Sequence, residues 1–188
     1  YRDIIDFVLF NVNPFGYHLW YLSAYMYVLV IFYICVKEHV VNLLFIVSPL
    51  LLLADLILGK YSLLTLGQEL NYIYIRNFLF VGIPYFSIGV FIKKRYNNGN
   101  ICACKYLFLG GAVLFSLTSL LERYLLENYG INAIRDHYIS TTLLSICLFL
   151  LAISFSQMRS CSVWVLLGAK YSLYIYVLHP LVDYCFKY

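Results

Sequence analysis

Charged residues are scarce in this sequence: Asp, Glu, Lys and Arg make up only 12% of its 188 residues. A water-soluble domain carries about 25% of them, because a chain folded in water needs polar side chains to cover its surface. Hydrophobic residues make up 63% of the sequence, which leaves too few polar residues for that cover. The composition therefore excludes a soluble globular domain. The net charge of +4 is spread over short turns, so we predict no nucleic-acid partner.

Linker-forming residues are also few, with 4 Pro and 10 Gly and no segment of low complexity. We therefore expect residues 1–188 to form a single domain. The 6 cysteines are scattered, and Cys102 and Cys104 have no second pair at metal-ligand spacing, so we predict no metal site. A signal peptide has a basic segment followed by a short apolar run, and no such pattern is visible in this sequence.

What the sequence does contain is a series of long apolar runs. Each is close to the roughly 20 residues that a helix needs to cross the hydrocarbon core of a membrane. The pattern predicts an all-α integral membrane protein with about six transmembrane helices. The six runs are His18–Val36, Val40–Leu58, Ile73–Ile92, Tyr106–Leu126, Ile139–Phe155 and Tyr171–Phe186. Residues 1–16, which mix charge with apolar residues at helical spacing, are predicted to form an extracytoplasmic amphipathic lead-in.

The basic residues predict the orientation of these helices. They are densest in the short turn at 93–105, and short loops rich in Lys and Arg stay on the cytoplasmic side of a membrane. We therefore predict that the loops around 37–39, 93–105 and 157–170 are cytoplasmic. The first helix then runs from outside to inside.

Three segments carry a family resemblance. They are residues 18–22 (HLWYL), residues 76–89 (RNFLFVGIPYFSIG) and residues 168–180 (GAKYSLYIYVLHP). In this order and spacing they resemble the membrane acyltransferase-3 family, whose members are bacterial inner-membrane enzymes that O-acylate surface polysaccharides. The first segment is similar to the branch that includes fucose-4-O-acetylase-like proteins.

The resemblance implies a reaction. It is the transfer of an acyl group, here acetyl, from acyl-CoA to a sugar hydroxyl of a surface polysaccharide or its lipid-linked precursor. Acyl-CoA would be a co-substrate in this modification of the cell envelope, and no bound cofactor is implied. The protein would lie in the lipid bilayer of the bacterial cytoplasmic (inner) membrane.

The resemblance also implies what precedes and follows the chain. Family members resemble bundles of about ten spanning helices, the element that satisfies its own backbone polar groups in lipid. Their first helix carries a His that is thought to be catalytic, and no such pattern precedes His18. We therefore expect an internal or C-terminal fragment that lacks the main catalytic His. The parent protein would be an enzyme, and the 188 residues alone would be inactive.

Polar side chains inside apolar helices are costly in lipid and mark functional positions. Ser172, Tyr176, His179 and Asp183 are spaced to lie on one face of the last helix. This stripe predicts a cavity or substrate path in which His179 is a catalytic candidate. The alternative is a structural His that bonds within the bundle.

Further candidates lie near the predicted membrane surfaces. His18, at the outer end of the first helix, is a second catalytic candidate, with an interfacial aromatic belt as the alternative. Trp20 and Arg76 are predicted to bind substrate, since a guanidinium holds phosphate or carboxylate; Arg76 could instead reach the lipid headgroups.

A cluster of cations lies in the turn after the third run. Lys93, Lys94 and Arg95 could attract the phosphates of acyl-CoA. Membrane topology and anionic lipid explain these cations without a ligand and are the favoured alternative.

Two other classes of function stay open. The polar stripe on the last helix could line a proton or solute path in a transport or channel subunit. Broken helices in symmetric pairs would favour that function, and the sequence shows no clear internal symmetry. A non-catalytic membrane scaffold is the third possibility.

Overall fold

We describe the protein from a computed structural model. The structure describes residues 5–7, 10–11, 20–68, 70–71, 74–97, 104–131, 137–155 and 167–187. Most of the predicted lead-in at 1–16, and His18 with it, lies outside these residues. The chain divides into two compact units, Tyr1–Ser154 and Phe155–Tyr188, and each is treated by itself.

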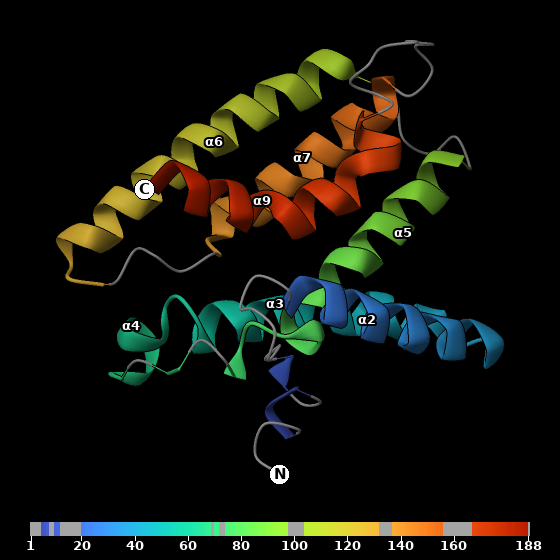
Figure 1. Cartoon of the computed structure of the whole chain (residues 1–188), viewed down its shortest axis with the longest axis horizontal. Helices are drawn as coiled ribbons and strands as arrows, with labels where there is room; N and C mark the ends of the chain where they lie inside the picture. Colours follow the sequence, from blue (N-terminus) through green and yellow to red (C-terminus); the bar gives the residue numbers. More distant parts are fainter. Residues whose placement is uncertain are drawn as a thin grey trace. The chain divides into compact units, whose positions relative to one another are not determined.

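Each of the six predicted apolar runs contains a helix, and the described residues contain no strand. The third run was expected to be helical from Ile73, but residues 75–77 form a turn and bends, and the helix starts at Phe78. The long helices are coloured along the chain in Figure 1. Short elements precede or follow some of them: α4, and the π-helical segments η3 and η4. The elements are α2 (Trp20–Lys37), α3 (Val41–Leu58), α4 (Ser62–Leu66), η3 (Phe78–Gly82), α5 (Ile83–Asn97), α6 (Lys105–Asn128), α7 (Ile139–Phe155), η4 (Leu167–Tyr171) and α9 (Ser172–Lys187).

The fold is that of an all-α membrane protein. Among the described helices, α2, α3 and α6 are long and apolar enough to cross a membrane, and α7 is a shorter apolar helix. The count of six spans, and the ten-helix bundle, stay predictions.

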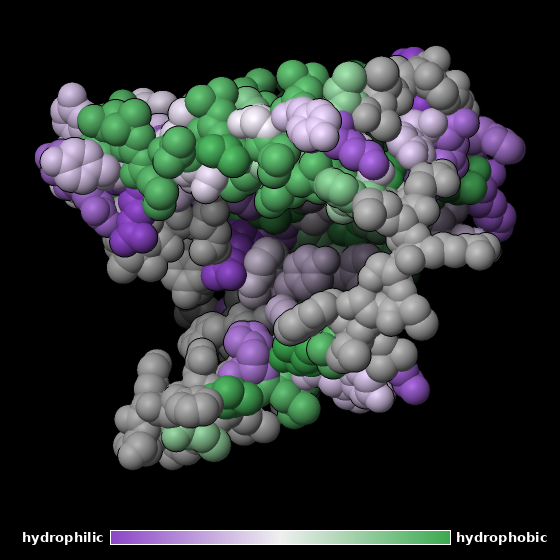
Figure 2. All heavy atoms as spheres, turned by 90° about the horizontal axis from the view of Figure 1, so that it is seen from above, coloured by the Kyte–Doolittle hydropathy of each residue, from purple (hydrophilic) through white to green (hydrophobic). Residues whose placement is uncertain are grey.

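Large apolar side chains cover the outside of the helices. Leu107, Leu117 and Leu120 on α6 each expose more than half of their surface, and Figure 2 shows broad hydrophobic areas on the visible face. Exposing such an apolar surface to water would be unfavourable, whereas the hydrocarbon core of a lipid bilayer accommodates it.

In the first unit, α2, α3 and α5 pack against one another around a small apolar core. The core consists of Val28, Phe32 and Ile83, with Phe86 packed against it. Phe32 and Phe86 meet edge to face, with their ring centroids 4.6 Å apart. Gly82 lets η3 approach α2 closely, because a Cβ there would lie 2.8 Å from the Cγ2 of Val28. This contact holds the start of α5 against α2.

The proline in the third apolar run coincides with an irregular helix. Pro84 is the second residue of α5, and η3 lies directly before it. Proline has no N–H to continue an α-helical ladder. The backbone instead winds wider, so that the N–H of Gly82 donates to the carbonyl of Asn77 at 3.4 Å. Wider turns of this kind are frequent at functional sites.

The helices α6 and α7 meet at two places. Near the middle, Gly111 faces Cys147, and a Cβ at Gly111 would lie 2.9 Å from that sulfur. Nearer the other end, Glu122 of α6 accepts from the backbone N–H groups of Ile139 and Ser140 at 3.2 and 3.3 Å. Small residues let membrane helices approach closely, and a carboxylate satisfies the unpaired N–H groups at the start of a helix.

Candidate functional site

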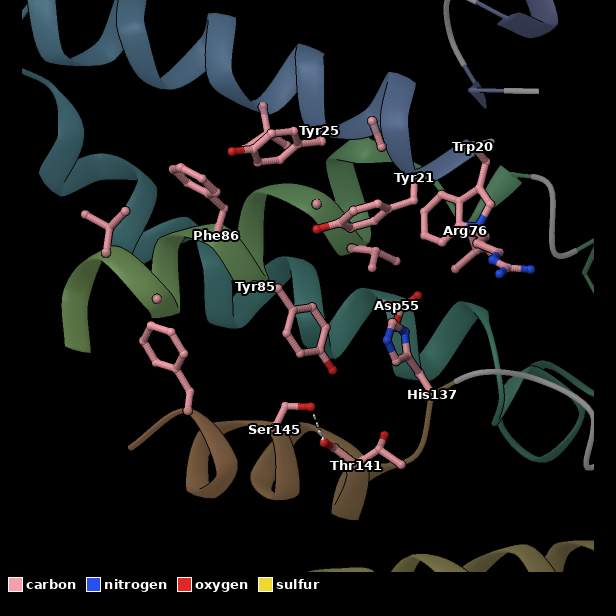
Figure 3. A pocket seen from close by; sticks show the side chains of 18 of the residues that line it. Trp20, Tyr21, Tyr25, Asp55, Arg76, Tyr85, Phe86, His137, Thr141 and Ser145 are labelled. Carbon is pink, nitrogen blue, oxygen red and sulfur yellow. Dashed lines mark hydrogen bonds and ion pairs between the residues drawn. The ribbon is translucent and has the colours of Figure 1, made fainter. Parts of the chain in front are cut away.

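A large cavity opens in the first unit, with a volume of about 1560 Å³. Its walls come from α2, α3, α5 and α7 and from the segments around Lys60, Arg76 and His137. Figure 3 shows these side chains from close by. A cavity that collects polar groups from several helices is where membrane proteins place their sites.

The α2 wall is aromatic. Trp20, Tyr21 and Tyr25 line the cavity, and the rings of Tyr21 and Tyr25 stack with centroids 6.2 Å apart. They are at helical spacing, so they share one face of α2. Aromatic faces of this kind bind the apolar faces of ring-shaped ligands and leave a polar edge for hydrogen bonds.

Trp20 and Arg76, both predicted to bind substrate, are brought together. The guanidinium carbon of Arg76 lies 4.5 Å from the centroid of the Trp20 ring, within the range of a cation–π interaction. Both residues line the cavity and lie side by side in Figure 3. The ring holds the cation beside the cavity, where a guanidinium can bind a phosphate or carboxylate.

Asp55 and His137 form an imidazole–carboxylate contact in the cavity. The Nδ1 of His137 lies 2.9 Å from the Oδ2 of Asp55. The Asp55 side chain is only 6% exposed and that of His137 is 22% exposed. A buried carboxylate in an apolar helix costs about 2.5–3.5 kcal/mol on insertion scales. The contact with the His137 imidazole offsets this cost.

Glu122 secures the segment that carries His137. Its carboxylate accepts from the hydroxyl groups of Tyr61 and Ser140 as well as from the two N–H groups at the start of α7. Tyr61 lies between α3 and α4, so Glu122 joins three parts of the first unit. His137 precedes α7 by two residues and is held in place by this junction.

Tyr85 completes this end of the cavity. Its ring stacks on the imidazole of His137, with centroids 5.3 Å apart and planes 22° from parallel. Its hydroxyl lies 3.1 Å from the Oγ1 of Thr142 on α7. In Figure 3, Tyr85 lies beside His137, and its hydroxyl points towards the side of α7 that carries Thr141 and Ser145.

Lys93, Lys94 and Asn97 line the cavity from the last turns of α5. Lys94 is nine residues beyond Tyr85, which is about 14 Å along a helix. Arg95 is not among the lining residues, and its guanidinium carbon lies 5.3 Å from the Phe91 ring. The structure thus separates the two lysines from the arginine that the sequence grouped with them.

The predicted stripe on the last helix belongs to the second unit. His179 is exposed, and its Nδ1 donates to the backbone carbonyl of Tyr176 at 2.6 Å. Ser172 is exposed and Tyr176 is partly buried. The side chain of Asp183 lies outside the described residues. We predicted that the stripe faces the first and third apolar runs. This stays a prediction, since those runs belong to the first unit.

Sequence reasoning missed His137 and the role of Asp55. The neighbouring charged residues of α6 have other partners, since Arg123 pairs with Glu127 at 3.2 Å on an exposed face. The available signal was an acidic residue in an otherwise apolar run. Nothing in the sequence connects position 55 with position 137.

The cavity therefore combines an imidazole–carboxylate pair, an aromatic wall and two sets of cations. In comparison with known families, the family model described as an acyltransferase domain (Acyl_transf_3) matches residues 3–188. Neither the curated proteins nor the solved structures give a match. The match covers almost the whole chain and agrees with the all-α membrane fold. This chain belongs to the acyltransferase-3 family of membrane proteins.

Proposed function

We propose that the protein transfers an acetyl or similar acyl group from acyl-CoA to a sugar hydroxyl of a surface polysaccharide or its lipid-linked precursor. Family membership supports a membrane acyltransferase in general. The finer proposal rests on one observation: a single cavity reaches from the Lys93–Lys94 pair to the Trp20–Arg76 pair. A donor with phosphates and an acceptor with a sugar ring could therefore meet inside it.

The two ends of the cavity suit different substrates. Lys93 and Lys94 lie in the basic turn that the charge distribution predicts to be cytoplasmic, the compartment that supplies acyl-CoA. Their ammonium groups would hold its phosphates, while the flexible thioester arm extends along α5. Trp20 and Arg76 would bind the acceptor at the outer end. The protein would then lie in the bacterial inner membrane with the Lys93–Lys105 turn inside.

The first test uses the natural full-length protein that carries this chain, reconstituted in lipid vesicles with labelled acetyl-CoA. Substitution of both Lys93→Gln and Lys94→Gln should raise the KM for acetyl-CoA about tenfold, the equivalent of about 1.4 kcal/mol of binding. The matched control is Arg95→Gln, which removes the adjacent cation outside the cavity and should leave KM unchanged.

Two results would contradict the proposal. The first is a wild-type protein that transfers no acyl group from acetyl-CoA or from longer acyl-CoA donors, as a transport subunit or scaffold would behave. The second is an equal rise in KM for the lysine variant and for Arg95→Gln, which would indicate a general surface-charge effect. That residues 1–188 alone are inactive stays a prediction that the same assay checks.

A further inference from the structure

The family resemblance gives no role to the pair of Asp55 and His137 in the cavity. We propose that His137 is the base that takes the proton from the acceptor hydroxyl, and that Asp55 is its positioning residue. This inference rests on the proposed function, and it places the base within the chain described here.

The contact with Asp55 suits one arrangement of protons on the imidazole. An ionised carboxylate can only accept a hydrogen bond, so in the proposed mechanism the Nδ1 of His137 carries the hydrogen and Asp55, 2.9 Å away, accepts it. In the neutral ring the lone pair is then on Nε2. This is the tautomer that a general base needs, and a buried carboxylate stabilises the imidazolium that forms.

The surroundings hold the ring in one orientation. Tyr85 stacks on it at 5.3 Å and is held through Thr142 of α7, while Glu122 secures the start of α7. The other charged side chains that line this end of the cavity are Lys60 and Arg76. A base must be held in place to act within a fixed geometry.

The reaction balances without a further reactant. The acceptor hydroxyl gives its proton to Nε2 of His137 as its oxygen attacks the thioester carbonyl of acyl-CoA. The carbon–sulfur bond then breaks, and the leaving thiolate takes the proton back from the imidazolium. The products are the O-acyl ester and coenzyme A with a free thiol, and His137 returns to its neutral form.

The test measures acetyl transfer by the natural full-length protein and its variants in lipid vesicles. His137→Ala should lower kcat by about 100-fold or more, with the KM for acetyl-CoA changed less than about threefold. Added imidazole should restore part of this activity.

The variant His137→Gln distinguishes a catalytic base from a residue that only holds the structure together. Glutamine keeps an N–H for Asp55, but its amide is no base, so the variant should fold and stay inactive. Asp55→Asn should lower kcat without preventing binding of acetyl-CoA. The matched control is His39→Asn in the exposed turn after α2, a position with φ of 58° that Asn tolerates; it should leave activity unchanged.

Different results would overturn the inference and the proposed function. If the wild type transfers acyl groups and His137→Gln is as active as the wild type, His137 is a structural tie and the proposed function stands. The same holds if His137→Ala keeps activity within about threefold of the wild type. If the wild type transfers no acyl group, both the inference and the proposed function are wrong.

Discussion

Two histidines of this chain use the same ring atom for hydrogen bonding, in very different surroundings. The Nδ1 of His137 lies 2.9 Å from the Oδ2 of Asp55, a residue of α3 that is 82 positions away in the sequence. His179 donates from Nδ1 to the carbonyl of Tyr176, three residues earlier in its own helix. The first lines a cavity, and the second is exposed in its unit.

The origin of the two bonds explains the difference. Pro180 has no N–H, so it leaves the carbonyl of Tyr176 without its usual donor four residues later, and His179 occupies that acceptor. Any histidine before a proline in a helix can make this bond without a second helix. The bond of His137 requires α3 and the start of α7 to meet. A polar residue in an apolar helix is thus a stronger sign of a site when its partner comes from a distant part of the chain.

The largest effect is expected where the two histidines are compared directly in acetyl transfer. His137→Ala should cost about 100-fold or more, the range for loss of a general base. His179→Ala removes a hydrogen bond within its own helix, which contributes about 1 kcal/mol to folding stability, so it should lower kcat far less than His137→Ala. His179→Gln should cost less, because it keeps a donor.

The measurement is kcat, with the amount of each variant in the membrane as the control for folding. A greater loss for His179→Ala than for His137→Ala would reverse the comparison. The stripe on α9, with Ser172, Tyr176 and Asp183, would then carry the chemistry.

A second prediction concerns the junction that positions His137. Glu122→Gln replaces a carboxylate that accepts from the start of α7. Hydrogen bonds to charged groups contribute about 1.5–3 kcal/mol, so the free energy of unfolding should fall by about that amount and activity should fall with it. Unfolding in denaturant, followed by fluorescence, measures the loss.

The matched control for Glu122 lies five residues further along the same helix. Glu127 pairs with Arg123 on an exposed face, and exposed pairs of this spacing contribute about 0.3–0.5 kcal/mol. Glu127→Gln should therefore be close to neutral. Equal losses for the two variants would mean that the junction does not stabilise the site.

The smallest effect is expected at the packing of α6 on α7. A Cβ at Gly111 would lie 2.9 Å from the Sγ of Cys147, whereas a Cβ at Gly110 would meet nothing within 4 Å. Gly111→Ala should lower the free energy of unfolding by about 1 kcal/mol, because the added methyl group overpacks the contact between the two helices. Gly110→Ala should raise it slightly, because Ala favours helix.

A double variant checks the cause of the Gly111 effect. Cys147→Ala removes the sulfur that the new methyl group would meet, so it should relieve much of the loss at Gly111. If Gly111→Ala and Gly110→Ala have equal effects on stability, the close approach of the two helices is wrong.

Most helical elements were predictable to within a few residues, except that the third run was expected to start at Ile73 and becomes helical only at Phe78. The run Val40–Leu58 corresponds to α3 at Val41–Leu58, and the run Ile139–Phe155 has the same bounds as α7. Apolar runs of membrane length form helices in lipid because no other open element satisfies its backbone there. Of the predicted site, Trp20, Arg76, Lys93 and Lys94 line one cavity, while Arg95 does not. His137 was not predicted at all.

The sequence by itself determined the helical class, the membrane as solvent and the family, since each follows from composition, run length or local motifs. Only the tertiary structure decided which polar side chains meet. Asp55 was one acid in an apolar run and His137 one residue of a polar loop, and their pairing depends on how α3, α5 and α7 pack. The physical reason is that hydrophobic periodicity is local, whereas a hydrogen bond between residues 82 positions apart depends on the packing of helices that no local pattern encodes.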